Sequence, residues 1–296
     1  MNKRNDAFSE YHPVVNFLFF AFIIVFTMFN LHPLILSVSF ACSGLYAVYL
    51  YGKKALKTGA LFVLPMFVFI AVINPLVNHR GMTILAYLPN GNPVTLESIA
   101  HGAASAVMLV SVIAWFTCFN AVITSDKFIY IFGRFVPALA LILSMSLRMV
   151  PRFKQQTAVI SNAQKCIGKN VSKGSILERA ACGLKILSIL VTWALENAVE
   201  TADSMKSRGY GLPGRSAFSV FKFTKRDKYL TLFLFICFSA VMVGSRAGFF
   251  SFQFFPYMRF VGEGLYFYAV FFLLAALPVI INIYEDLMWK RTESKI

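Results

Sequence analysis

The chain has 296 residues, of which 58% are hydrophobic and only 14% are charged. A soluble domain has about 45–50% apolar and about 25% charged residues, so this composition excludes a water-soluble globular protein. The mean hydropathy is +0.68 and the formal net charge is +15. Long apolar runs satisfy their backbone groups in lipid only as helices or closed barrels, and these runs lack the alternation of barrel strands. The composition therefore predicts an all-α, polytopic membrane protein.

Six apolar runs have roughly the length of about 20 residues that a membrane-spanning helix needs. They cover residues 14–30, 33–51, 60–78, 99–124, 229–247 and 264–284. The first run follows a charged stretch, residues 1–12, that is similar to the start of a signal peptide. Because a second long run follows at once and no small-residue cleavage site lies between them, we interpret the first run as an uncleaved span.

The distribution of Lys and Arg predicts the orientation, because cytoplasmic loops retain positive charge during insertion. With the N-terminus inside, the external loops are residues 31–32, 79–98 and 248–263. Near these loops lie only Arg80, Arg246 and Arg259, and the other 25 basic residues fall inside. We therefore expect both termini to lie in the cytoplasm.

Two further apolar stretches, residues 135–150 and 184–195, test this topology. If both crossed the membrane, eight Lys and Arg residues from Arg148 to Lys185 would lie outside. Each stretch is also short for a crossing and is followed by charged residues at helical spacing. We expect both stretches to lie in the cytoplasm or at its membrane surface.

These assignments divide the chain into three parts. Residues 1–125 form the first four spans, residues 126–228 form a cytoplasmic helical domain, and residues 229–296 form the last two spans and a short tail. The middle part holds 17 Lys or Arg residues and 6 Asp or Glu residues, so it carries +11 of the net charge. A basic internal loop beside anionic lipid has the same property, so charge alone does not identify a partner.

Residues 176–207 contain no proline and place apolar residues at steps of three and four, which predicts one long amphipathic helix. The expected apolar face comprises Ala180, Leu184, Leu187, Val191, Ala194, Ala198, Ala202 and Met205. This face narrows to alanine near its end, where small residues allow another helix to approach closely. The opposite side carries Glu196, Glu200, Asp203 and Lys206.

The tripeptide Ser207-Arg208-Gly209 follows this helix. Glycine adopts the left-handed conformation that ends helices, and Arg208 then lies in the final turn, where cations are favoured. An arginine that projects past a helix end suits a carboxylate-bearing or carbonyl-lined pocket on another protein. A second helix is predicted over residues 152–166, with Pro151 in its first turn and Gly168 at its end. An ordinary capped surface helix is the alternative interpretation of each ending.

The segments SLRMVPRFKQQTAVISNAQKCIG (146–168) and ALENAVETADSMKSRGYG (194–211), with YHPVVNF (11–17), resemble the transmembrane T component of energy-coupling factor (ECF) importers. This family includes membrane subunits of vitamin and cobalt or nickel uptake systems. The resemblance implies a non-catalytic scaffold in a prokaryotic plasma membrane that couples two ABC-type ATPase subunits to a separate substrate-binding membrane (S) subunit. It also implies that ATP and Mg²⁺ are bound by the partners and that this chain carries no cofactor.

The family has an Ala-Arg-Gly-like motif at the end of each of two coupling helices, and the resemblance implies that these arginines dock into the two ATPases. Ser207-Arg208-Gly209 matches the second motif, with Ser in place of Ala. At the first motif Ile167 replaces the arginine before Gly168, and Lys165 or Lys169 is the candidate substitute. Further docking candidates are Arg148 and Arg215. The residues expected to pack or orient the coupling helix are Ala194, Ala198, Ala202, Met205, Glu200 and Asp203.

Three rival functions find less support in the residues. Residues 209–216 match the spacing of a phosphate-binding loop, but a helix precedes them and Pro213 removes an amide donor. An ion-coupled secondary transporter that acts alone is the main alternative, yet the spans have no ionisable residue away from their edges. Asn74-Pro75 is able to break the third span and line a cavity, although proline also occurs in membrane helices for packing. No carboxylate pair, HExxH or GxSxG arrangement indicates a membrane enzyme.

Histidine and cysteine do not occur at metal-binding spacing, so we expect no metal site. Five cysteines occur singly, at positions 42, 118, 166, 182 and 237, which indicates neither a disulfide framework nor a zinc site. His101 has Glu97 four residues before it, at the outer end of the fourth span. A metal or proton site there is the alternative to the preferred interpretation, a solvated end of the span.

Overall fold

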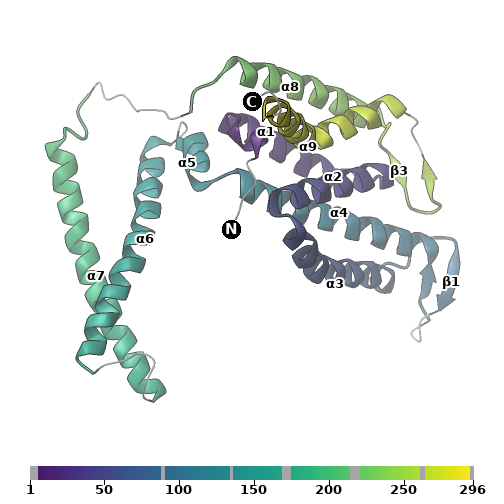
Figure 1. The fold of residues 1–296 in the computed structure, drawn as a ribbon. Helices are drawn as coiled ribbons and strands as arrows, with labels where there is room; N and C mark the ends of the chain where they lie inside the picture. Colours follow the sequence, from purple (N-terminus) through teal and green to yellow (C-terminus); the bar gives the residue numbers. More distant parts are fainter. Residues whose placement is uncertain are drawn as a thin grey trace. The chain divides into compact units, whose positions relative to one another are not determined.

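The structure is a computed structural model that describes residues 6–87, 91–133, 136–168, 175–213, 221–260 and 264–293. The described residues are mainly helical (Figure 1). They divide into two compact units, one formed by residues 1–128 with 221–296 and the other by residues 129–220. The second unit lies within the stretch 126–228 that the charge distribution marks as the cytoplasmic domain.

The first unit contains the apolar helices and one short 3₁₀ helix, Ala7–Glu10. Its helices are α1 (Pro13–Phe29), α2 (Pro33–Tyr51), α3 (Lys53–Val77), α4 (Leu96–Val122), α8 (Lys225–Arg246) and α9 (Leu265–Glu293). Helix α4 packs against α1, α2 and α3, while α9 packs against α2 and α8. Helices from both ends of the sequence therefore form one bundle (Figure 1).

Local sequence signals fix where these helices begin. Helices α1 and α2 both start with proline after a histidine, and the Nδ1 atoms of His12 and His32 each accept a hydrogen bond of 3.3 Å from the backbone two residues on. Proline is favourable at this position because its missing N–H has no partner in a first turn. Helix α8 begins with a capping box between Thr224 and Asp227.

Four of the six predicted spans coincide with long apolar helices, namely α2, α4, α8 and α9. The other two correspond to α1, Pro13–Phe29, and to the apolar part of α3, Val63–Val77. By length and composition alone, a fifth long helix in the second unit, Ile176–Ser207, is also able to cross a membrane. The chain is thus a multi-pass membrane protein, and the cytoplasmic position of Ile176–Ser207 remains a prediction from its flanking charges.

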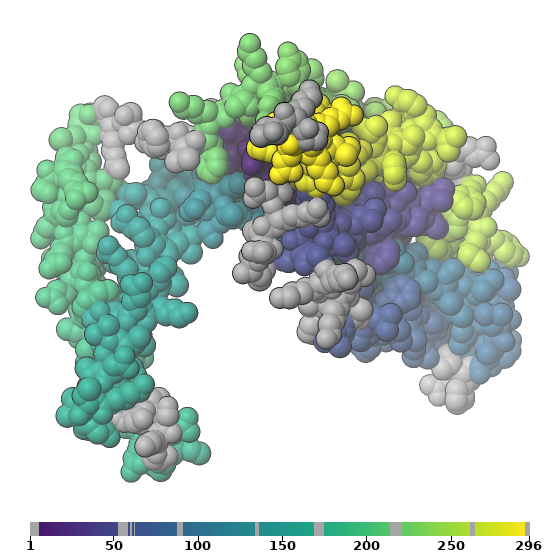
Figure 2. All heavy atoms as spheres, viewed as in Figure 1, coloured from purple at the N-terminus to yellow at the C-terminus, as the bar shows by residue number. Residues whose placement is uncertain are grey.

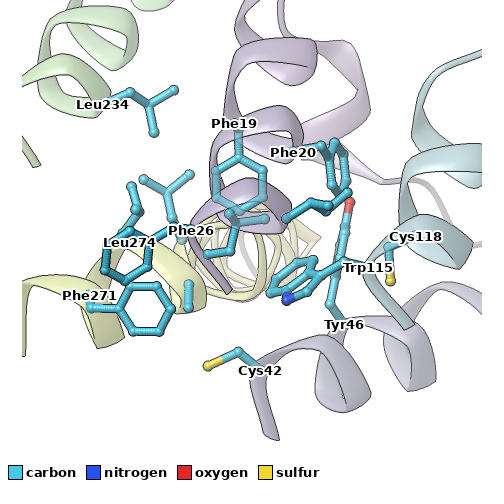
Figure 3. Packing of buried hydrophobic residues seen from close by; sticks show 14 of the residues in the cluster. Phe19, Phe20, Phe26, Cys42, Tyr46, Trp115, Cys118, Leu234, Phe271 and Leu274 are labelled. Atoms are coloured by element: carbon cyan, nitrogen blue, oxygen red, sulfur yellow. The ribbon is translucent and has the colours of Figure 1, made fainter. Parts of the chain in front are cut away.

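The core of the first unit is aromatic. The indole ring of Trp115 lies 5.9 Å from the ring of Phe19 and 6.2 Å from that of Phe20, both in edge-on geometry (Figure 3). Its Nε1–H donates a 2.9 Å hydrogen bond to Ser39 Oγ, which lies 3.0 Å from Thr27 Oγ1. Buried polar groups cost stability unless they are paired, and here the partners come from three helices. This network therefore fixes how α1, α2 and α4 pack together.

Two small β-hairpins interrupt the loops that we expect to be external. Strands β1 (Ile84–Tyr87) and β2 (Pro93–Thr95) pair antiparallel between α3 and α4. Strands β3 (Phe252–Gln253) and β4 (Arg259–Phe260) pair in the same way between α8 and α9. The sequence predicts only loops for both segments, because strands of two to four residues leave little periodic signal.

The second unit is built on two long helices, α6 (Pro137–Cys166) and α7 (Ile176–Ser207), which follow the short helix α5 (Ser125–Gly133). The limits predicted for α7 are confirmed. The predicted start of the preceding helix at Pro151 is wrong, because α6 begins at Pro137 and Pro151 lies inside it. A proline inside a helix removes one backbone hydrogen bond, and the turns on both sides of Pro151 continue the helix despite that loss.

Candidate functional site

Helix α7 ends in a hydrogen-bonded turn, and Arg208 is its C-cap residue. This residue has φ −84° and ψ 9°, and Gly209 follows with a left-handed φ of +78°. The N–H of Tyr210 donates to the carbonyl of Met205, and that of Gly209 donates to the carbonyl of Lys206, both at 3.0 Å. These two bonds define a Schellman motif, which satisfies carbonyls that a helix end otherwise leaves unpaired. The side chain of Arg208 is exposed on this ordered tip.

Helix α6 ends in the same way at Ile167. Its φ of −89° and ψ of 12° match those of Arg208 within a few degrees, and Gly168 follows with φ +80°. The Gly168 N–H donates to the carbonyl of Lys165 at 3.0 Å, as the Gly209 N–H does to Lys206. Ile167 and Arg208 are therefore structurally equivalent residues. The side chain of Ile167 is 71% exposed.

The two tips lie at opposite ends of a helical hairpin. Helices α6 and α7 cross (Figures 1 and 2). Ile160 of α6 packs with Cys182 and Ile186 of α7. Nearer the start of α6, the ring of Phe153 lies 6.0 Å from that of Trp193. The helices are thus antiparallel, so the α6 tip lies at the hairpin end where α7 begins. At 1.5 Å per residue, the length of α7 separates the tips by on the order of 45 Å.

The structure places the other predicted docking residues differently. Lys165 lies in the last turn of α6, with its Nζ atom 3.5 Å from Asn162 Oδ1. Arg148 is exposed on α6, about 30 Å along the helix axis from Gly168, so it lies at neither tip. Ser207 is the last residue of α7. Lys169 and Arg215 fall outside the described residues.

The apolar face predicted on α7 for contact with a partner is not the face that packs against α6. The face that packs against α6 includes Cys182, Ile186 and Trp193, none of which is in the predicted set. Of the residues expected to pack, Ala194 and Met205 are half-buried, whereas Ala198 and Ala202 are exposed. Glu200 and Asp203 are also exposed, as predicted for the polar side. The first half of α7 is therefore apolar on two sides, and the contact of the predicted face with a partner stays a prediction.

An exposed apolar strip therefore remains along α7. It consists of Leu184, Leu187, Val191, Leu195 and Val199, with exposed fractions between 49% and 66%. Leu195 and Val199 lie outside the predicted apolar face, although they continue the spacing of four from Val191. An exposed apolar strip of this kind is typical of a surface that contacts another protein or lipid.

The side chains of His101 and Glu97 do not form the alternative metal or proton site. The Glu97 carboxylate is buried and accepts hydrogen bonds from the backbone N–H and the hydroxyl of Thr83. The His101 ring instead packs edge-on against Phe254 at 5.2 Å, with Nδ1 3.4 Å from Asn74 Oδ1. Within the described part of the chain, no group of three His, Cys, Asp or Glu side chains is placed to hold a metal ion.

A comparison with protein families identifies the chain. The cobalt transport protein family (CbiQ) matches residues 7–220, which is more than two thirds of the sequence and includes both helix tips. The chain belongs to this family. The match covers the first four predicted spans and the α6–α7 hairpin, so the tips described above are features of the CbiQ-like part.

Several curated relatives of this CbiQ family member are named energy-coupling factor transporter transmembrane protein EcfT. The protein from Lactobacillus helveticus is 37% identical over 93 residues, or 31% of this chain and 34% of the relative. That from Exiguobacterium sibiricum is 37% identical over 112 residues, 38% of this chain and 42% of the relative. That from Lactococcus lactis is 35% identical over 102 residues, 34% and 38% of the two chains. The matches thus span about a third to two fifths of each relative.

Proposed function

We propose that this chain is the transmembrane coupling (T) subunit of an ECF-type importer. In this proposal, two ABC-type ATPase subunits bind ATP and Mg²⁺ and grip the tips of α6 and α7. Their closure moves the hairpin, and the hairpin transmits the motion to a separate membrane subunit that binds a vitamin or a transition-metal ion. Both termini and the hairpin lie in the cytoplasm of a prokaryotic cell, and this chain carries out no catalysis.

The observation that carries the proposal is the exposed guanidinium of Arg208 on a closed helix tip. Guanidinium is planar and always charged, and it presents donors in a fork that matches a carboxylate. The Schellman motif holds the backbone of the tip, so docking orders one side chain rather than a whole loop. A helix of 32 residues behind the tip carries a displacement along its length.

The equivalent positions of Arg208 and Ile167 on the two helix tips support two different docking partners. The two residues share one backbone conformation but differ in side-chain chemistry, since one is a cation and the other an exposed aliphatic group. A pocket that binds a guanidinium offers carboxylates or carbonyls, whereas a pocket that binds Ile167 is apolar. We infer that the two ATPase subunits are different polypeptides, each matched to one tip.

The test replaces Arg208 with glutamate in the assembled transporter. Arg208→Glu is expected to release the ATPase that docks on α7 from the solubilised complex and to abolish ATP-driven uptake. The matched control is Lys206→Glu, which reverses a charge on the same last turn but leaves the tip residue in place, and it is expected to retain both properties. Normal co-purification and uptake by Arg208→Glu would reject the proposal.

Reconstitution of the chain with and without its partners distinguishes this function from that of a secondary transporter. A coupling subunit reconstituted alone in vesicles moves no substrate under an ion gradient, and uptake requires the ATPases, the substrate-binding subunit and ATP. Substrate movement by the lone chain, driven by an ion gradient and indifferent to ATP, would favour the secondary transporter.

A further inference from the structure

Helices α1 and α8 run side by side in the first unit and are joined at both ends. At their starts, the backbone N–H of His12 donates a 2.9 Å hydrogen bond to Asp227 Oδ1. At their other ends, Ser245 Oγ donates to Asn30 Oδ1 at 3.4 Å. Between these two contacts a groove of about 470 Å³ lies between the helices, with Leu274 of α9 in its lining.

The lining of the groove is hydrocarbon. Figure 3 shows part of it, formed by Phe19 and Phe26 of α1, Leu234 of α8 and Leu274 of α9. Among the described lining residues, the three with polar side chains already have partners within the chain. Thr231 Oγ1 donates to the Asp227 carbonyl, Ser245 binds Asn30, and Asn30 Nδ2 donates to the Phe26 carbonyl. The groove therefore suits an apolar ligand, because its lining is mostly hydrocarbon and its three polar side chains are already hydrogen-bonded within the chain.

The groove is open on the outer, exposed side of α1 and α8. Residues on its rim are exposed, with Val25 at 52%, Phe29 at 78% and Phe235 at 55%. Both helices are predicted membrane spans, so this side faces the lipid chains of the bilayer. The lining on α1 runs from Leu18 to Asn30 at the far end of the helix, which is about 18 Å along a helix axis and therefore more than half of a hydrocarbon core about 30 Å thick.

A protein helix does not fit as the occupant. A helix with its side chains is about 10–12 Å wide. The contacts at His12–Asp227 and Asn30–Ser245 hold α1 and α8 together at both ends, so the space between them cannot open to that width without breaking these bonds. A volume of about 470 Å³ instead lies within the range of pockets that hold small ligands.

A basic cluster lies at one end of the groove. Lys225, Arg226 and Lys228 are exposed in the first turn of α8, and the lining residue Thr231 follows one turn later. The Arg226 guanidinium lies over the Tyr11 ring, 5.3 Å from its centre, which holds this cation at the start of α1. Basic side chains beside a membrane attract anionic lipid headgroups.

We propose that this groove binds one acyl chain of an anionic phospholipid, whose phosphate lies at Lys225 and Lys228. The lipid chain fills the groove beside the contact between Phe22 of α1 and Phe238 of α8 and thereby completes the packing of these two helices. The headgroup lies at the end of α8 where the basic segment joins the membrane unit. This site is independent of the docking function proposed for the helix tips.

The experiment uses the full chain in phosphatidylcholine nanodiscs that contain a photoactivatable phosphatidylglycerol with a diazirine on its acyl chain. Cross-links are expected to concentrate on the groove-facing residues of α1 and α8. Ala21→Trp fills the groove and is expected to reduce this labelling, whereas Ala269→Trp, an exposed alanine of α9 outside the groove, is expected to preserve it. Val25→Trp blocks the open rim and serves as a second variant if Ala21→Trp does not fold.

The headgroup is tested by the double variant Lys225→Gln with Lys228→Gln. It is expected to reduce the preference for phosphatidylglycerol over the same probe built on phosphatidylcholine by roughly fivefold for each lysine. Its control, Lys290→Gln with Arg291→Gln, removes the same charge at the end of α9. Three outcomes would overturn the proposal: labelling spread evenly over all apolar helices, equal labelling by the two probes in the wild type, or cross-linking of groove residues to another membrane protein in native membranes.

Discussion

The backbone N–H of His12 donates a 2.9 Å hydrogen bond to the Asp227 carboxylate, across 215 positions of sequence. The same carboxylate caps its own helix, because its Oδ2 atom accepts from the backbone N–H of Thr224 at 2.8 Å and from the Thr224 hydroxyl at 2.6 Å. Asp227 is buried, with an exposed fraction of 4%. One side chain thus starts α8 and joins it to the start of α1.

Replacing Asp227 with asparagine is expected to lower the stability of the membrane unit. The amide keeps one acceptor oxygen but puts a donor against N–H and hydroxyl groups, which costs about 1–3 kcal/mol when buried. The measurement is thermal unfolding of the purified chain in detergent. Asp126→Asn, an exposed first-turn aspartate of α5, is the control and should change stability by less than about 0.5 kcal/mol. Equal effects of the two variants would contradict the tie between α1 and α8.

The left-handed glycine at the α7 tip gives a second prediction. Gly209→Ala places a Cβ atom at φ +78° and only 3.1 Å from Leu212 Cδ1, so it should destabilise the turn by about 1–2 kcal/mol. Gly183→Ala, inside α7 with open space at its Cβ position, should instead stabilise the helix by about 0.5–1 kcal/mol. Amide hydrogen exchange of residues 204–210 is the direct measurement. We expect faster exchange and weaker ATPase binding in Gly209→Ala alone.

Ile167 allows a test of the second docking contact. If its side chain is buried in an apolar pocket, Ile167→Asp should lose about 1.5–3 kcal/mol of binding free energy at the α6 tip, and Ile167→Val should lose much less. Val159→Asp is the control, because Val159 is also exposed on α6 but lies two turns before the tip. Affinities of the separate ATPases for the solubilised chain provide the measurement. Undiminished binding by Ile167→Asp would show that this tip docks through another residue.

The native cysteines report the orientation of the hairpin. Of the five, Cys166 is exposed at the end of α6, whereas Cys42, Cys118, Cys182 and Cys237 are buried. A membrane-impermeant maleimide should therefore label the wild-type chain at one position, and Cys166→Ser should abolish the labelling. We expect labelling in inside-out vesicles and none in intact cells. The reverse pattern would put the α6 tip outside, where no cytoplasmic ATPase reaches it.

The sequence by itself determined the features that depend on local chemistry. Membrane class follows from apolar runs, because lipid offers no hydrogen bonds and forces such runs into helices. The limits of α7 and the glycines that end both long helices were also predicted, since left-handed glycine stops a helix through its own backbone. The comparison of the two Ala-Arg-Gly-like motifs places Ile167 at the position that Arg208 occupies. In the structure both residues adopt the same helix-capping conformation.

Only the tertiary structure decided which of several allowed contacts form. Two sides of α7 are apolar, and packing against Ile160 uses the side with Cys182 and Ile186, which leaves the side predicted to contact a partner exposed. The bond from His12 to Asp227 and the groove between α1 and α8 join segments more than 200 positions apart, which leave no periodic signal in a single sequence. Local propensity fixes where a helix begins and ends, whereas its neighbours are chosen by the packing of the whole chain.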